Sequence, residues 1–101
     1  MNAQPRPSEI EWHEVKCLYP CGSSLMGTVS AIVPFGLIVA LPSSPVVGVV
    51  LAPGFDSAAA FQRRRELYPL GVQVGVRVLG YSEGRLQVDL MLESNGEKES
   101  Q

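Results

Sequence analysis

The stretch GTVSAIVPFGLIVAL, residues 27–41, predicts a strand, a bend and a second strand. Pro34 has no N–H to give to a strand ladder, so it belongs in the bend and not inside either strand. Gly36 permits a bulge or a sharp coil directly after the bend. Alternate residues from Leu37 to Leu41 then fall on one face of the second strand. A strongly coiled hairpin of this kind is what a small closed barrel requires.

Alternation and turn signals along the chain predict five strands, at residues 24–33, 35–41, 46–51, 72–79 and 86–92. A short helix is expected at 58–67, where Asp56 or Ser57 can cap its start and Pro69 lies just beyond its end. Three strands, a helix and two strands is the order of the OB-fold, an all-β, five-stranded Greek-key barrel with a short helix between strands three and four. A small SH3-like barrel is the alternative, but it would not usually place a helix there.

One domain is expected from 101 residues, of which 46% are hydrophobic and 18% charged, a globular composition. We assign residues 10–92 to this domain, 1–9 to a disordered N-terminal segment and 93–101 to a disordered acidic tail. Residues 10–18 are expected to form a helical turn or an irregular plug at one barrel end, with Trp12 and Val15 as anchors. The chain shows no signal segment and no bilayer-length apolar run, which predicts a cytoplasmic protein without membrane association.

Charge is distributed unevenly along the chain, whose net charge is −2. Residues 16–92 contain six cationic and four acidic side chains, so the expected barrel is mildly basic. The excess of acidic residues lies at the two ends of the chain. Five of these six cations are arginine, which suits phosphate and base contacts. The distribution permits nucleic-acid binding without requiring it.

Five motifs in order resemble the ribosomal-protein S-one type RNA-binding domain, a member of the OB-fold family. They are the glycine and valine of GTVSAI (27–32), the phenylalanine-glycine of PFGLIV (34–39), the glycine-led GVVL (48–51), the glycine-valine start of GVQVGVRVL (71–79), and GRLQVDL (84–90) at the closing strand. The resemblance covers residues 22–92. It implies that single-stranded RNA binds on strands two and three, where aromatic side chains stack on bases and basic side chains follow the backbone.

By position, the resemblance implies five nucleic-acid-binding residues: Phe35, Ile38, Leu51, Arg77 and Arg85. Phe35 occupies the first stacking position, whereas Ile38 replaces the second aromatic residue and Leu51 replaces the usual histidine at the end of strand three. We expect weak binding of low sequence specificity, with RNA that is ribosome- or transcript-associated as the partner. The alternative is a protein-interaction module that has lost RNA binding and docks a protein partner on Phe35, Ile38 and Leu51.

Other candidate sites have simpler structural interpretations. Residues 63–65 are three consecutive arginines, which we expect to be a solvated helix face with Glu66 as a local partner. Arg77 and Arg85 could each pair with Asp89 or Glu83 across strands instead of contacting RNA.

His13, Cys17 and Cys21 are spaced by four, but Pro20 interrupts the helix and structural zinc needs four ligands. We therefore expect buried thiols and no disulfide, metal or cofactor. The chain shows no catalytic arrangement around its single histidine and no phosphate-binding glycine loop, so we expect no enzyme.

Overall fold

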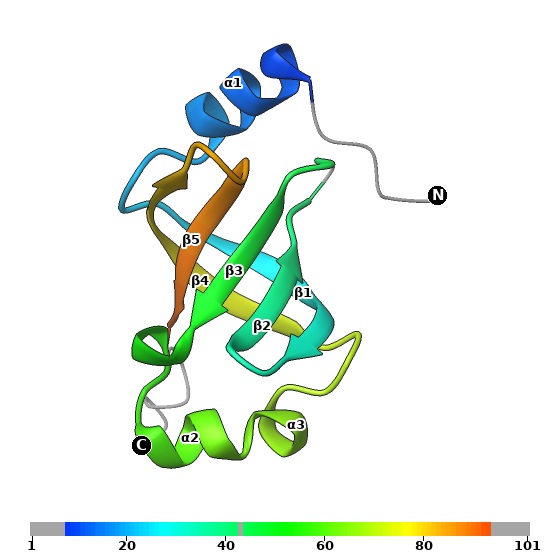
Figure 1. Cartoon of the computed structure of the whole chain (residues 1–101), viewed down its shortest axis with the longest axis vertical. Coiled ribbons are helices and arrows are strands. Elements are labelled where there is room, and N and C mark those ends of the chain that lie inside the picture. The colour runs from blue at the N-terminus through cyan, green and yellow to red at the C-terminus, as the bar shows by residue number, and fades with distance from the viewer. Residues whose placement is uncertain (1–7, 43, 94–101) are drawn as a thin grey trace.

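A closed five-stranded β-barrel forms the centre of the molecule (Figure 1). This computed structural model describes residues 8–42 and 44–93. Its strands are β1 (Ser24–Val33), β2 (Gly36–Ala40), β3 (Val47–Leu51), β4 (Gln73–Ser82) and β5 (Gln87–Leu92). All five lie where alternation and turn signals predicted them, and their ends differ from the expected ones by up to three residues. Of the segments expected to be disordered, 1–9 and 93–101, residues 1–7 and 94–101 lie outside the described residues.

The strands follow one another around the barrel in the order β1-β2-β3-β5-β4, and β4 pairs with β1 to close it. All neighbours are antiparallel except β3 and β5, which run parallel. β1 and β4 have ten residues each, whereas β2, β3 and β5 have five or six. With helices after β3 and before β4, this topology is that of the OB-fold, and the expected fold class is confirmed.

The barrel interior is filled by aliphatic side chains from alternate strand positions, as the pattern predicted. Leu37 and Val39 of β2, Val50 of β3 and Val88 of β5 have no exposed surface. Gly36 is required where β2 begins, because a Cβ atom at this position would lie 1.8 Å from the Val50 carbonyl oxygen. The close approach of β2 to β3 therefore depends on this glycine.

The helix α1 (Glu9–Leu18) covers one end of the barrel (Figure 1). Ser8 accepts from the Glu11 N–H and the Glu11 carboxylate accepts from the Ser8 N–H, which forms a capping box. Because of this cap the helix has ten residues instead of the expected turn, and it starts inside the segment 1–9 that was expected to be disordered. Trp12 and Val15 are buried, as predicted.

α1 is anchored by side chains from β4 and the β4–β5 turn. The Trp12 indole N–H donates to Glu83 at 2.7 Å, and the Lys16 ammonium lies 2.8 Å from the same carboxylate. Tyr81 packs edge-on against Trp12 and donates its hydroxyl to the Tyr19 carbonyl at 2.7 Å. Residues 10–18 therefore cover the barrel end and add no strand to it.

The opposite end of the barrel is covered by a 3-10 turn, η1 (Ala52–Gly54), and two short helices, α2 (Ala58–Gln62) and α3 (Arg64–Leu67) (Figure 1). The single helix expected at 58–67 is thus interrupted at Arg63. The Phe61 carbonyl accepts from the Arg64 guanidinium at 2.8 Å, which accompanies this break. Ser57 caps α2, as one of the two predicted candidates. Leu67 of α3 is 42% exposed.

Two further expectations need correction. Residues 80–82, which lie beyond the strand expected at 72–79, continue β4 because pairing with β5 resumes after a bulge between Val78 and Gly80. Cys17 and Cys21, expected to be buried, are both exposed free thiols. In the described part of the chain no helix has the length and apolar character to cross a membrane.

Candidate nucleic-acid interface

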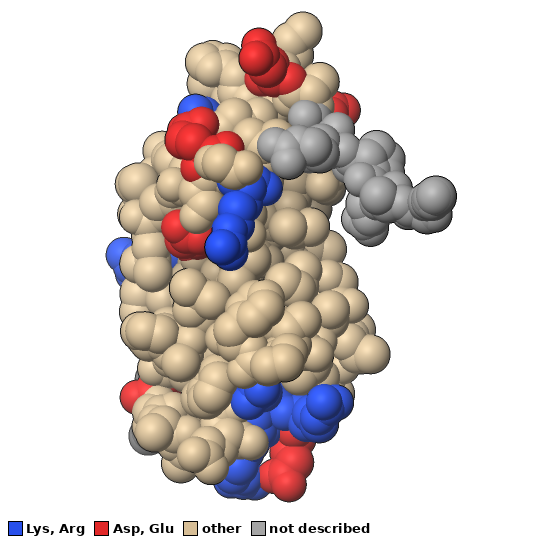
Figure 2. Space-filling model, in the orientation of Figure 1, with Lys and Arg blue, Asp and Glu red and all other residues tan. Residues whose placement is uncertain are grey.

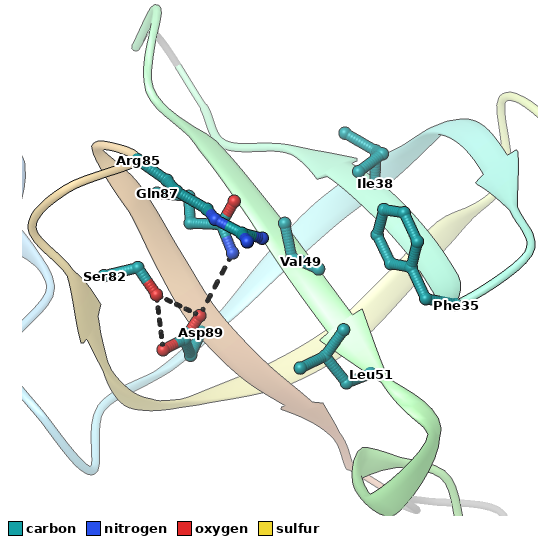
Figure 3. Close-up of a pocket in the computed structure, with 8 residues that line it drawn as sticks. All are labelled: Phe35, Ile38, Val49, Leu51, Ser82, Arg85, Gln87 and Asp89. Atoms are coloured by element: carbon teal, nitrogen blue, oxygen red, sulfur yellow. Dashed lines mark hydrogen bonds between the residues drawn. The ribbon is translucent and has the colours of Figure 1, made fainter.

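A pocket of about 320 Å³ lies on the outer face of the barrel across β2, β3 and β5 (Figure 3). Eight residues line it: Phe35, Ile38, Val49, Leu51, Ser82, Arg85, Gln87 and Asp89. They come from the β1–β2 bend, three strands, the end of β4 and the β4–β5 turn. Residues from both halves of the chain therefore form one concave surface.

Strand pairing brings the central lining residues side by side. Val49 of β3 lies opposite Ile38 of β2 on one side and opposite Asp89 of β5 on the other. Gln87 of β5 pairs with Ser82 at the end of β4. The parallel pairing of β3 with β5 thus joins an apolar half of the pocket to a polar half.

The apolar half consists of Phe35, Ile38, Val49 and Leu51. Phe35 is 52% exposed and Leu51 44%, so two large apolar side chains reach solvent on one small surface. Val49 also faces outward, since it alternates with the interior Gly48 and Val50, but only 2% of it is exposed. Val49 therefore forms a covered apolar floor, with the Phe35 ring available at the rim.

The polar half is organised around the Asp89 carboxylate (Figure 3). Ser82 donates its hydroxyl to both carboxylate oxygens, at 3.2 and 3.1 Å, and the Gln87 amide donates at 3.3 Å. These bonds hold the carboxylate in place. The Gln87 side-chain oxygen adds a further acceptor, so this half of the pocket is rich in hydrogen-bond acceptors.

Arg85 supplies the positive charge of the pocket. It is exposed in the β4–β5 turn, and in the described part of the chain its side chain has no hydrogen bond or ion pair. Figure 3 shows the side chain extending from the turn toward Val49. The next residue, Leu86, has a φ of +54° and packs against the core, which anchors the turn beside the arginine. The guanidinium remains available to a ligand.

The structure brings together four of the five residues that the sequence singled out: Phe35, Ile38, Leu51 and Arg85. Arg77 of β4 is not among the lining residues. Its guanidinium forms an ion pair with Glu93 at 2.9 Å, a partner that differs from the Asp89 and Glu83 considered from the sequence.

Sequence reasoning did not select Val49, Ser82, Gln87 or Asp89 as site residues. The alternation of β5 placed Gln87 and Asp89 on its outward face, and OB-fold topology sets β5 beside β3. Those two signals together could have identified the polar half. Ser82 lies beyond the strand expected at 72–79, so the sequence did not predict its pairing with Gln87.

The part of this face that lies over β2 and β3 carries few charged side chains (Figure 2). Figure 2 shows a largely uncharged surface over β2 and β3, with basic side chains gathered at the end where α3 lies. Of the three arginines in that region, Arg63 pairs with Glu66 at 2.8 Å, as expected. Arg64 is directed inward and donates to the Val33 and Pro34 carbonyls. The arginine run is therefore partly structural.

The spaced residues His13, Cys17 and Cys21 do not converge. The His13 ring nitrogen lies 3.6 Å from the Cys17 sulfur, whereas the Cys21 thiol is directed at the Leu79 carbonyl. Within residues 8–42 and 44–93, no group of three or more histidine, cysteine, aspartate or glutamate side chains could hold a metal ion.

No protein-family model matches the sequence, and no curated protein matches it significantly. Solved structures do match. An uncharacterized protein of Methanocaldococcus jannaschii, MJ1198, has a TM-score of 0.59 at 19% identity, covering 74% of this chain and 93% of its own. GSP13 of Bacillus subtilis has a TM-score of 0.61 at 21% identity, covering 82% of this chain and 72% of its own.

RNase R of Mycoplasma genitalium matches with a TM-score of 0.63 and 15% identity. The match covers 83% of this chain but only 15% of that protein, which is therefore much longer. These identities are all below 25%, so the likenesses establish the fold. The protein is a closed, five-stranded OB-fold barrel, and its membership of the S-one type family stays a prediction.

Proposed function

We propose that this protein binds nucleic acid, and specifically single-stranded RNA, weakly and with low overall sequence specificity, in the pocket across β2, β3 and β5. The observation that carries the proposal is that one pocket is lined both by an exposed aromatic ring, Phe35, and by an arginine, Arg85, whose side chain has no partner among the described residues. Single-strand binding by OB-folds combines these two elements, a stacking platform and a cationic group for the backbone.

Stacking on Phe35 would supply most of the affinity. A base seated on the apolar half would contact Ile38 and Leu51 as well as the ring. Base–aromatic stacking is worth roughly 1–3 kcal/mol per base, and one ring supports one principal stacking contact. A single platform is the physical reason for weak binding.

Arg85 would neutralise a phosphate next to the stacked base. Each phosphate contact on a single strand contributes a slope of roughly −0.7 to the dependence of log K on log salt. Arg85 is the one arginine among the described residues that line the pocket, and the net charge of the chain is −2, so the long-range attraction for RNA is small. Binding is therefore expected at low salt and should weaken as salt rises.

Two structural neighbours support this proposal by their descriptions. One is RNase R. The other, from Streptococcus pneumoniae, is described as a multidomain protein with nucleic-acid-binding domains and matches with a TM-score of 0.57 and 16% identity over 89% of this chain and 30% of its own. Together with the sequence resemblance to S-one type domains, they favour a nucleic-acid-binding role. That the role is cytoplasmic, ribosome- or transcript-associated and non-catalytic is part of our proposal.

A protein-docking role is the second candidate, favoured by the aliphatic character of Ile38, Val49 and Leu51. An exposed apolar surface of this kind also suits a partner protein. Docking of that kind would not weaken with salt, because it would depend on apolar burial.

An amide NMR titration tests the proposal. The probe is a mixed-sequence single-stranded RNA of about ten nucleotides, a length within the site sizes of OB-folds. We expect shifts at residues 35–40, 49–51 and 82–89 that fade as salt rises. The absence of shifts at low salt would refute RNA binding and direct attention to protein partners. Shifts centred on Arg77 would place the interface elsewhere on the barrel.

A further inference from the structure

We infer that the RNA strand continues beyond the pocket onto α3, where Arg65 binds the phosphate on the far side of the base stacked on Phe35. This inference rests on the proposed RNA-binding function and adds a second phosphate contact to it. The interface then extends from the pocket to the end of the barrel that α2 and α3 cover.

The three consecutive arginines differ in what their side chains contact. Arg63 forms an ion pair with Glu66 at 2.8 Å, and Arg64 donates to backbone carbonyls. Arg65 is exposed, and among the described residues its side chain has no hydrogen bond or ion pair. Because Glu66 is occupied by Arg63, the charge of Arg65 has no acidic partner beside it. Arg65 is therefore the arginine of this run that is available to a ligand.

α3 is held next to the bend that presents Phe35. The Arg64 guanidinium donates to the Val33 and Pro34 carbonyls, and Pro34 directly precedes Phe35 in the chain. The Cα atom of Arg65 lies about 3.8 Å from that of Arg64, so its side chain starts from backbone that is anchored to the bend. A donor that starts from an anchored segment has less freedom to lose on binding than one on a free loop.

Phe35 lies between Arg85 and α3 on the barrel surface. The β4–β5 turn that carries Arg85 lies at the end of the barrel that α1 covers, and α3 lies at the opposite end (Figure 1). The Phe35 side chain lines the same pocket as Arg85, whereas the bend that carries it contacts α3. A nucleotide within a strand has one phosphate before it and one after it. With Arg85 on one side of the stacked base, the second phosphate lies on the side of α3.

The charge distribution on this face favours such a path. Figure 2 shows basic side chains at the end where α3 lies, next to the uncharged surface over β2 and β3. Residues 63–66 contain three arginines and one glutamate, so this end of the face is locally positive although the whole chain has a net charge of −2. A local excess of positive charge attracts a phosphate backbone.

The salt dependence of RNA affinity tests the second phosphate contact. The probe is a labelled, mixed-sequence single-stranded RNA of about ten nucleotides, a length within the site sizes of OB-folds. Anisotropy titrations at several salt concentrations give the slope of log K against log salt. Arg65→Gln should make this slope shallower by about 0.7, the contribution of one phosphate contact on a single strand. Arg65→Lys should keep the slope of the unaltered protein, because lysine also binds phosphate as a point charge. The side chain is exposed, so both variants should fold.

Arg63→Gln is the matched control, because it removes the same charge two residues away but its guanidinium is already paired with Glu66. Its slope should stay within about 0.3 of the unaltered value, less than half of one phosphate contact. Combining Arg65→Gln with Arg85→Gln should make the slope shallower by about 1.4, since the two arginines contact different phosphates.

A slope that changes in Arg85→Gln and not in Arg65→Gln would overturn the α3 contact and leave RNA binding in the pocket intact. Equal changes in Arg63→Gln and Arg65→Gln would also overturn it, since the arginine run would then act only as diffuse charge. So would a double variant no shallower than Arg85→Gln alone, because the two arginines would then share one phosphate. Failure of the unaltered protein to bind RNA at low salt would overturn the proposed function itself, and this inference with it.

Discussion

Arg64 and Val33 are joined by the arginine guanidinium, which donates from Nη2 to the Val33 carbonyl oxygen at 3.0 Å and from Nε to the same oxygen at 3.2 Å. Nη2 also donates to the Pro34 carbonyl at 3.1 Å. These two carbonyls belong to the bend that carries Phe35. α3 is thereby tied to the segment that presents the stacking ring, and an arginine outside the pocket lining helps to position that ring.

Replacing Arg64 by alanine should lower the free energy of unfolding by about 1–2 kcal/mol. The change removes charge-assisted hydrogen bonds to three carbonyls and the stacking of the guanidinium on Phe61, at 4.3 Å from the ring centroid. Urea denaturation followed by circular dichroism measures the effect. Arg63→Ala is the matched control: its ion pair with Glu66 is exposed and should contribute less than about 0.5 kcal/mol. Equal effects at the two positions would contradict the structural role of Arg64.

Gly36→Ala should destabilise the barrel by about 3 kcal/mol or more. The added Cβ would meet the Val50 carbonyl oxygen at 1.8 Å, and this atom belongs to backbone that cannot move without breaking the β2–β3 ladder. Thermal unfolding gives the measurement. At Gly84, where a Cβ would meet nothing within 4 Å, the same substitution should change the free energy of unfolding by less than about 1 kcal/mol. A tolerated Gly36→Ala would show that β2 does not approach β3 this closely.

Much of the fold was predictable because local signals agreed with tertiary pairing. The two-residue alternation gave all five strands, and the position of the helix after strand three pointed to an OB-fold. The sequence could not reveal the break at Arg63, because it coincides with a contact between Arg64 and a bend some thirty residues away. The extension of β4 to Ser82 was also hidden, since it depends on a bulge that forms only when β5 pairs with β4.

The candidate site was predictable in part, for a physical reason. Phe35, Ile38 and Leu51 lie on or next to adjacent strands β2 and β3, which the chain order already placed together. The polar half comes from β5, whose parallel pairing with β3 is a feature of barrel closure. Arg77 was not predictable in this way. Its side chain is exposed on the outside of β4, but the outer surface runs all the way around the barrel, and the pocket lies on another part of it.

Phe35→Ala should weaken binding of a ten-nucleotide single-stranded RNA by about tenfold, because stacking on an aromatic ring is worth roughly 1–3 kcal/mol per base. The ring is half exposed, so the fold should persist, and circular dichroism checks this. Leu70→Ala, which truncates an even more exposed apolar side chain outside the pocket, should leave affinity unchanged. If both variants bind as the unaltered protein does, Phe35 is not the platform.

Arg85→Gln should lower affinity at low salt and make the slope of log K against log salt shallower by about 0.7, the contribution of one phosphate contact on a single strand. Anisotropy titrations over a series of salt concentrations measure the slope. Arg63→Gln is the control, since its guanidinium is already paired with Glu66. Arg77→Gln maps the extent of the interface. A change in slope at Arg77 and none at Arg85 would contradict the assignment of the pocket as the binding site.

The attachment of α1 should weaken at acid pH through Glu83. Hydrogen bonds from Lys16 and Trp12 lower the pKa of this carboxyl below its ordinary value of 4.5. A group whose pKa is lowered by folding contributes stability above the pKa of the unfolded chain, and this contribution is lost as pH falls through the lower folded value. Trp12 is the sole tryptophan, so its fluorescence during urea unfolding at pH 7 and pH 3 reports the loss directly.

Glu83→Gln should show a smaller decrease in the urea midpoint between the two pH values than the unaltered protein, because the titrating carboxyl is gone. Glu14→Gln, which removes an exposed carboxylate from the helix itself, should keep the full decrease. An unchanged decrease in Glu83→Gln would show that other carboxyl groups account for the acid sensitivity.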